Sequence, residues 1–369
     1  MPKIVLENVC KRFDDFVAVE NLNMVIEDRE FITLLGPSGC GKTTTLRMIA
    51  GLETPTEGKI TIGDQVVFDS EKGINVSPAK RDIGFLFQNY ALWPHMTVYQ
   101  NIAFGLENLK WPKDKIKERV AEMLQMLKIE EFEKRYPSEL SGGQQQRVAI
   151  ARTLAPSPKV LFMDEPLSNL DAKLRLEMRT ELKRLHVDTD STFVYVTHDQ
   201  LEAMTLATRV CLIKNGVMQQ YDHPLETYSN PANLFVADFV GNPTMNFIDA
   251  TGKVTGENTA ELNFFGKTFT LNAKGGLKQT EETEFVVGVR PEFVKLGEGA
   301  LTGKVYATLP AGMETTVKLD VDGFVLTSVE FGSVDYMVND EIPFGIDGEN
   351  VILFEKKSGE SLGKGCVTL

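Results

Sequence analysis

Short apolar runs alternate with amphipathic segments from the start of the chain to about residue 240. Several runs are apolar at successive positions, which is typical of parallel strands covered on both faces. We predict strands at Phe31–Leu35, Ile83–Phe87, Val160–Met163, Phe193–Thr197 and Val210–Ile213. Apolar residues recur at helical spacing over Asp114–Lys128 and Asp171–His186. This alternation of strands and helices predicts an α/β domain.

The pattern changes in the last third of the chain. Apolar and polar residues alternate over Thr268–Asn272 and Thr315–Val321, and glycine and acidic turns separate such runs. Alternation of this kind predicts an all-β domain, a small barrel or sandwich, and we favour an OB-like barrel. We therefore expect an α/β domain over residues 1–240 and a β domain over residues 241–369, with the boundary in Gly241–Met245.

Composition narrows the protein class. Of 369 residues, 42% are hydrophobic and 25% charged, which is ordinary for a globular protein and excludes a disordered or collagen-like chain. The net charge of −13 argues against a general nucleic-acid binder. No apolar stretch approaches the roughly 18 residues of a membrane span, and the start does not resemble a signal peptide, so we expect any membrane role to be peripheral. Four scattered cysteines indicate free thiols in a reducing cytosol.

A glycine-rich segment predicts a phosphate site. Residues 36–43 read GPSGCGKT, which fits G-x-x-x-x-G-K-[ST], and they lie between a predicted strand and a helix expected over Thr43–Ala50. Backbone N–H groups would close around phosphate oxygens at the helix N-terminus. We expect Lys42 to reach the β- and γ-phosphates of ATP and Thr43 to ligate Mg²⁺. A glycine-rich turn that merely contains a lysine is the alternative. The nucleotide contacts predicted here are Gly36, Ser38, Gly39, Cys40, Gly41, Lys42, Thr43 and Thr44.

Cys40 lies among these backbone amides. Amide dipoles at a helix N-terminus favour the thiolate, so we expect a lowered thiol pKa. The alternative is an inert small residue that fills a turn.

Two carboxylates follow another predicted strand, Val160–Met163. We expect Asp164 to hold Mg²⁺ through water and Glu165 to polarise the attacking water, because phosphoryl transfer needs metal charge and a positioned nucleophile. A lone acidic pair is usually a solvated strand end, but the phosphate loop upstream favours the catalytic interpretation.

A second candidate anion site lies at Leu140-Ser-Gly-Gly-Gln144. Ser141 is a natural N-cap, and the two glycines leave amide groups bare at the start of a helix. One chain that binds one ATP has no evident need of two such sites. We therefore expect a symmetric dimer in which the loop of one subunit covers the γ-phosphate held by the other. A flexible helix start is the alternative. The residues predicted to act across the dimer are Ser141, Gly142, Gly143 and Gln144.

Taken together, GPSGCGKT, LSGGQ, and LFMDEP followed by Ser168-Asn-Leu-Asp171 resemble the ATP-binding cassette (ABC) family, in the family's order. The resemblance implies that Gln88 senses Mg²⁺ and the attacking water, and that His198 contacts the γ-phosphate. It places Asp171 across the dimer seam, and it implies a P-loop ATPase domain with an inserted helical region over about residues 89–158. It also implies that Phe13 stacks on adenine, although Phe16 lies nearby and the family more often has Tyr or Trp.

The resemblance extends beyond the ATPase motifs to importer ATPases. The segment after Gln88 looks like the one that seats a coupling helix of the membrane partner. Its apolar residues predict an interface, and a loop packed on its own core is the alternative. These residues are Leu92, Trp93, Pro94 and Met96. Gly241–Phe247 and Gly288–Glu292 are similar to the regulatory β-domain (TOBE domain) of maltose-type sugar-importer ATPases.

We therefore expect the ATP-hydrolysing subunit of an ABC importer for a sugar or oligosaccharide. The resemblance implies ATP and Mg²⁺ as cofactors, a homodimer, transmembrane permease subunits, an external solute-binding protein, and a place on the cytoplasmic face of the plasma membrane. The alternatives are a related importer for polyamine, iron or anion, a DNA-processing ATPase of the same superfamily, and a non-hydrolysing regulatory module. The sequence does not identify the transported molecule.

Overall fold

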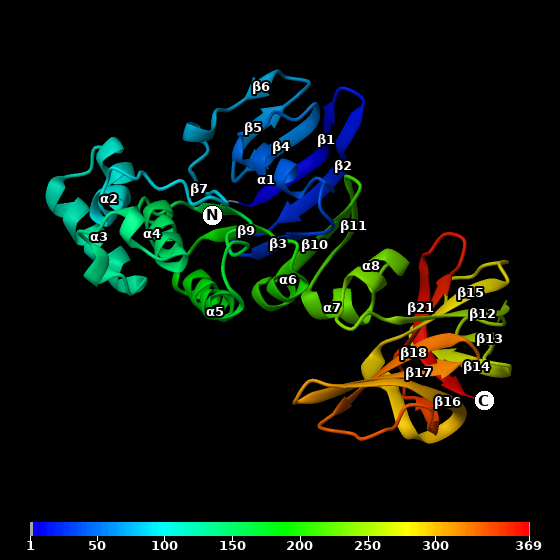
Figure 1. Ribbon diagram of the computed structural model, residues 1–369. Coiled ribbons are helices and arrows are strands. Elements are labelled where there is room, and N and C mark those ends of the chain that lie inside the picture. The colour runs from blue at the N-terminus through cyan, green and yellow to red at the C-terminus, as the bar shows by residue number, and fades with distance from the viewer. Residues whose placement is uncertain (1–2, 369) are drawn as a thin grey trace. The chain divides into compact units, whose positions relative to one another are not determined.

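A six-stranded sheet in the order β11-β10-β3-β9-β8-β7 forms the centre of the N-terminal part of the chain (Figure 1). Its strands are β3 (Phe31–Leu35), β7 (Ile83–Leu86), β8 (Val160–Asp164), β9 (Thr192–Val196), β10 (Arg209–Lys214) and β11 (Val217–Asp222). Neighbours from β10 to β7 pair in parallel, and β11 pairs antiparallel with β10. Every residue of β3, β8 and β9 is buried, which confirms the prediction from the apolar runs.

The computed structural model describes residues 3–368. A second, antiparallel sheet in the order β2-β1-β4-β5-β6 was not predicted. Its strands are β1 (Ile4–Phe13), β2 (Phe16–Ile26), β4 (Glu57–Ile62), β5 (Gln65–Asp69) and β6 (Ile74–Asn75). One hydrophobic cluster joins this sheet, helix α1 (Lys42–Ala50) and one face of the central sheet. The α1 helix and its phosphate loop are thereby held between two sheets.

Helices form a separate part of the same unit. They are α2 (Val98–Asn108), α3 (Lys113–Met126) and α4 (Gly142–Leu154), and all fall within residues 89–158, where a helical region was expected. Their apolar faces share a core with α5 (Ala172–Asp188) and with the other face of the central sheet. Helix α6 (Gln200–Leu206) follows β9. Within residues 3–368, no helix combines the length and apolar character needed to cross a membrane.

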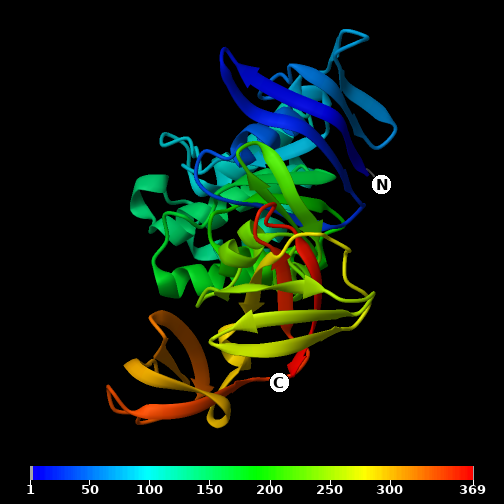
Figure 2. The ribbon, with the colours of Figure 1, turned by 90° about the vertical axis from the view of Figure 1, so that its right-hand side faces the viewer.

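The C-terminal unit is built mainly of strands. A closed barrel joins β12 (Asn246–Val254), β13 (Thr259–Phe264), β14 (Lys267–Ala273), β21 (Ser361–Thr368), β20 (Val351–Glu355) and β15 (Glu284–Val289). A separate sheet joins β18 (Phe324–Phe331), β17 (Glu314–Val321), β16 (Val294–Pro310) and β19 (Glu341–Ile346). Figure 2 shows the orange strands of this sheet beside the yellow-green and red strands of the barrel. The all-β expectation is confirmed, although the barrel has six strands where an OB-fold has five.

The expected boundary at Gly241–Met245 is too late. The chain divides after Pro224, so α8 (Leu234–Phe239) and nearly all of α7 (Pro224–Ser229) belong with the β strands. The physical reason is the buried side chain of Arg290, whose guanidinium donates hydrogen bonds to the carbonyls of Tyr228, Ala237 and Val240. The sequence pattern of two short helices could not reveal which unit they pack against.

Candidate functional site

The phosphate loop depends on glycine at two positions where backbone atoms crowd it. Gly36, Gly39 and Gly41 have φ of 151°, 78° and 103°, values that side chains disfavour. A Cβ on Gly36 would lie 2.2 Å from the Ile213 carbonyl oxygen, and one on Gly41 2.3 Å from that of Ala18. The loop is therefore pressed between β10 and β2, with its amides at the start of α1.

A cavity of about 320 Å³ opens over this loop. It is lined by Phe13, Phe16, Ala18, Ser38, Gly39, Cys40, Gly41, Lys42, Thr43, Thr44 and Glu165. Every predicted nucleotide contact except Gly36 is therefore gathered at one cavity. Phe13 and Phe16 are 43% and 58% exposed, and both line the cavity, so the geometry leaves the choice of stacking aromatic open.

The Lys42 ammonium lies inside the loop. Its Nζ donates hydrogen bonds to the carbonyl oxygens of Gly36 at 2.7 Å and Pro37 at 2.8 Å. The side chain is buried, so the positive charge is fixed at the floor of the cavity. This position is suited to a ligand that carries several negative charges.

The expected low pKa of Cys40 is wrong in direction. Burial raises the pKa of the Cys40 thiol above its ordinary value, and the nearby Lys42 ammonium offsets only part of that effect. The side chain is 3% exposed, so desolvation of the thiolate outweighs the amide dipoles. Cys40 is therefore better described as a buried, protonated side chain of the loop.

Two oxygen groups suited to Mg²⁺ meet at the edge of the cavity. The Thr43 hydroxyl donates a 2.9 Å hydrogen bond to Oδ1 of Asp164, the last residue of β8. Among residues 3–368 there is no group of three or more His, Cys, Asp or Glu side chains that would hold a metal alone. Mg²⁺ is commonly held by one or two protein oxygens together with phosphates and water, and Thr43 with Asp164 fits that role.

Arg47 is a neighbour of this pair that sequence reasoning missed. Its Nη2 lies 3.4 Å from Oδ2 of Asp164. Arg47 follows Thr43 by four residues in α1, so both side chains lie on one face of the helix. The helical spacing places Arg47 on the same face as Thr43, but only the packing of α1 beside β8 brings Asp164 to that face.

Glu165 and His198 lie together. Oε2 of Glu165 is 3.3 Å from Nδ1 of His198, and Glu165 lines the cavity over the phosphate loop. Glu165 has φ of 45°, an uncommon conformation for a residue with a side chain, and its carbonyl accepts a 2.9 Å bond from the Ser168 hydroxyl. Strain at a carboxylate beside a cavity is typical of a functional position.

Gln88 contacts the same turn from the other side. Its Nε2 lies 3.3 Å from the Ser168 hydroxyl, and its backbone carbonyl accepts a 3.2 Å bond from Nδ2 of the Asn169 side chain. Gln88 is therefore tied to the loop after Glu165 rather than to Thr43 or Asp164.

The LSGGQ segment forms a capped helix start. Ser141 and Gln144 make a reciprocal capping box at the start of α4, which confirms Ser141 as the N-cap. A Cβ on Gly143 would lie 2.5 Å from a methyl group of Leu174, so this glycine allows α4 and α5 to approach closely. Neither Ser141 nor Gly142 lines the cavity over the phosphate loop of its own chain. Asp171 caps α5, since its Oδ1 accepts a 3.0 Å bond from the Leu174 amide.

The apolar segment after Gln88 is less exposed than expected. Leu92 packs against the helical core, and the ring centroids of Trp93 and Phe104 lie 4.2 Å apart. Met96 is partly buried, and Pro94 is exposed. The helical core of the same chain therefore covers part of this segment, so the surface left for a partner is smaller than expected.

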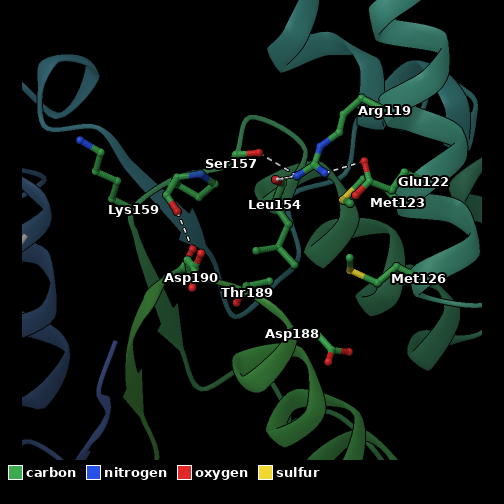
Figure 3. A pocket seen from close by; sticks show the side chains of 12 residues that line it. Arg119, Glu122, Met123, Met126, Leu154, Ser157, Lys159, Asp188, Thr189 and Asp190 are labelled. Atoms are coloured by element: carbon green, nitrogen blue, oxygen red, sulfur yellow. Dashed lines mark hydrogen bonds and ion pairs between the residues drawn. The ribbon is translucent and has the colours of Figure 1, made fainter. Parts of the chain in front are cut away.

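A further cavity of about 300 Å³ lies between α3 and the loops that enter β8 and β9 (Figure 3). Its charged side chains are already paired. Arg119 lies 2.7 Å from Glu122 and donates to the Ser157 hydroxyl at 2.8 Å. Asp190 pairs with Arg29 at 3.1 Å. We assign this cavity no chemistry.

Comparison with known proteins agrees with the motifs. Residues 19–168 match the family model described as ABC transporter. The trehalose/maltose import ATP-binding protein MalK of Thermococcus litoralis is 44% identical over 98% of this chain and 100% of its own. The osmoprotective compounds uptake ATP-binding protein GgtA of Synechocystis is 41% identical over 97% and 98%.

A solved structure gives the same assignment for the N-terminal unit. The ATP-binding cassette MJ0796, in a dimeric post-hydrolysis state with ADP and Pi, has a TM-score of 0.52 and 34% identity. It covers 60% of this chain and 98% of its own. With the phosphate loop, Asp164, Glu165 and His198 in place, the chain belongs to the ABC transporter family and is an ATPase of that family.

Proposed function

We propose that the protein is the ATP-hydrolysing subunit of an importer that takes up a sugar or oligosaccharide through membrane permease subunits. The observation that carries the proposal is the placement of Glu165 between the phosphate-loop cavity and His198. A non-hydrolysing module would have no need of a carboxylate held there. The similarity of the whole chain to the Thermococcus trehalose/maltose protein supports a sugar as the cargo.

Each residue of the site then has a role in hydrolysis. Lys42 holds the β- and γ-phosphates of ATP, with the amides of the loop around them. Thr43 and, through water, Asp164 would hold Mg²⁺, and Gln88 would sense the ion and the attacking water. The ion would neutralise charge on the phosphates. Glu165 orients and polarises the attacking water, and His198 contacts the γ-phosphate. Phe13 stacks on the adenine.

Two copies of the chain complete the site. Ser141, Gly142, Gly143 and Gln144 of one copy cover the γ-phosphate bound to the other, and Asp171 lies at the seam. The position of the capped LSGGQ segment away from its own cavity supports this arrangement, as does the dimeric state of the MJ0796 structure. ATP then draws the copies together, and hydrolysis releases them.

Permease subunits receive the resulting movement. Leu92, Trp93, Pro94 and Met96 form the coupling surface, of which Pro94 is the most accessible part. The chain then lies on the cytoplasmic face of the plasma membrane, held there by the permease, and a solute-binding protein delivers cargo from outside. Nucleic acid has no role in this cycle.

The C-terminal unit, from Leu225 onward, serves as an OB-like (TOBE) regulatory or dimerisation domain. Its closed barrel and additional sheet support this assignment.

Two measurements test the proposal. Phosphate release by the purified full chain should require Mg²⁺ and ATP and should not rise when double-stranded DNA is added. Stimulation by DNA would favour the DNA-processing alternative. The chain reconstituted with its co-purified permease should drive uptake of labelled maltose or trehalose. Uptake of a polyamine, iron or an anion instead would reassign the cargo and leave the ATPase role standing.

A further inference from the structure

One arginine joins the helix that starts with the LSGGQ segment to the coupling segment. Arg152 lies in the last turn of α4. Its Nη2 donates a 2.7 Å hydrogen bond to the Tyr90 carbonyl, and its Nη1 donates a 2.6 Å bond to the Ala91 carbonyl. Its guanidinium also lies 4.8 Å from the ring centroid of Trp93. A planar guanidinium holds two adjacent carbonyls and an aromatic face at once, which a lysine ammonium does less well.

The receiving segment is held in an uncommon conformation. Tyr90 and Ala91 have φ of 60° and 45°. Two consecutive residues with positive φ are unfavourable when neither is glycine, so contacts from elsewhere in the fold must stabilise them. Arg152 binds the carbonyls of both residues. A basic residue in the last turn can bond the last carbonyls of its own helix, but these bonds join Arg152 to residues about sixty positions earlier in the chain.

Residues 90 and 91 also lie between the turn that follows Glu165 and the coupling surface. The Tyr90 hydroxyl lies 3.4 Å from the carbonyl of Pro166, which follows Glu165 directly. Trp93 is fixed to α2 because its backbone N–H and carbonyl both bond to the buried Asn101 amide. A displacement of residues 90 and 91 would therefore also move their contacts with Pro166 and the neighbouring Trp93.

Helix α4 connects the two ends rigidly. Arg152 follows Ser141 by eleven positions, which is about 16 Å along a helix. We propose that Arg152 is a positioning residue that carries the movement of the LSGGQ segment to the Tyr90–Trp93 segment when two copies close on ATP. This inference rests on the proposed dimer closure and adds the residue that couples that closure to the membrane-facing surface.

The chain supplies a reporter at the proposed contact. It has two tryptophans, Trp93 and Trp111. In a Trp111→Phe, Glu165→Gln full-length chain, Trp93 is the single tryptophan, and ATP remains bound without turnover. Mg²⁺-ATP should change the Trp93 emission in that chain, and light scattering should show association.

Arg152→Gln should abolish most of the ATP-dependent change in Trp93 emission, while ATP affinity and association stay within about threefold, because Arg152 does not line the cavity. In the chain with Glu165 restored, the variant should lower kcat about tenfold and leave KM for ATP within about twofold. Arg152→Lys should recover part of both signals, because it keeps a cation beside the Trp93 ring. If Arg152→Gln fails to fold, Arg152→Lys decides alone: a reduced Trp93 response with unchanged association supports the role of Arg152, and a response equal to that of the parent overturns it.

Arg119→Gln is the matched control. Arg119 belongs to α3 and donates to the carbonyls of Leu154 and Ala155, at the same end of α4 as Arg152. Its side chain lines the cavity of Figure 3 and does not contact residues 90–93. It should lower stability yet leave the Trp93 response intact. An equal loss in Arg119→Gln, or an unchanged response in Arg152→Gln, would overturn the role of Arg152. Absence of ATP-dependent association in the parent chain would instead overturn the proposed dimer.

Discussion

The Nδ1 atom of His198 lies 3.3 Å from Oε2 of Glu165, although 32 residues separate them in the chain. The pairing of β8 with β9 explains this contact. Asp164 pairs with Val196 in the parallel register, so the residues that follow each strand leave the sheet at the same edge. Ligand sites of parallel α/β sheets occur at this carboxyl edge. The contact is thus a direct consequence of strand order and register.

We expect Glu165→Gln to leave ATP binding intact, lower turnover at least about a hundredfold, and yield a stable ATP-dependent dimer. The amide keeps the shape of the side chain but no longer polarises water. Phosphate release and light scattering with Mg²⁺-ATP measure the two effects. Glu177→Gln, on the exposed face of α5, is the control and should behave as the parent chain. Turnover near the parent rate in Glu165→Gln would place the base elsewhere.

Lys42→Ala should lose nucleotide binding or turnover, because the ammonium fixed by the Gly36 and Pro37 carbonyls is the positive charge at the floor of the cavity. Fluorescent-nucleotide titration and phosphate release measure both. Lys80→Ala, an exposed lysine outside the cavity, should change neither. Retention of both activities in Lys42→Ala would argue strongly against the phosphate-site assignment.

Substitution by alanine should lower the stability of the chain less at Gly39 than at Gly41, because the two glycines differ in their surroundings. Both Gly39 and Gly41 have positive φ, but a Cβ on Gly39 meets nothing within 4 Å, whereas one on Gly41 meets the Ala18 carbonyl. Gly39→Ala should therefore cost about 1 kcal/mol from backbone strain alone. Gly41→Ala should cost at least about 3 kcal/mol, because the loop must also move away from β2. Denaturant unfolding of the nucleotide-free chain measures both, and equal losses would contradict the crowding at Gly41.

Cys40 gives a pH-dependent test of the cavity. Because burial raises the pKa of its thiol, the reactive thiolate is scarce at neutral pH, and the rate of alkylation should still be rising at about pH 9. Bound ATP should block the reaction by covering the loop. Cys366 is partly exposed and serves as an internal control whose labelling ATP should not change. Cys211 should stay unlabelled, since burial raises its pKa to about 12. Equal labelling of Cys40 with and without ATP would contradict its place in the site.

The features predicted from sequence are those encoded locally. The apolar run Phe31–Leu35 and the glycine-rich loop after it are continuous in the chain, so their pattern and spacing identify β3 and the phosphate loop. The contact of Arg47 with Asp164 depends on how α1 lies beside β8, which no local pattern contains. The half-buried state of Trp93 likewise depends on Phe104 and Arg152, which other segments supply. The exposed fraction of the apolar segment after Gln88 therefore could not be predicted from its own sequence.

The contact of α7 and α8 with the barrel is testable through Arg290. Its guanidinium is buried and donates to three carbonyls, and it lies 4.1 Å from the ring centroid of Tyr228. Arg290→Met keeps most of the side-chain volume but leaves those carbonyls without this donor. We expect a loss of about 3 kcal/mol in the calorimetric transition of the C-terminal unit, with little change in that of the N-terminal unit.

Hydrogen exchange in the Arg290→Met chain locates the effect. Amides of α8 should exchange faster, while amides of β13 and β14 stay protected, because the arginine anchors the helices rather than the barrel. Lys295→Met is the matched control, since its exposed ammonium donates to a single carbonyl, that of Glu292. It should cost less than about 0.5 kcal/mol. If Arg290→Met left the exchange of the α8 amides unchanged, the arginine would not anchor the helices to the barrel, and the boundary would return to the expected Gly241–Met245.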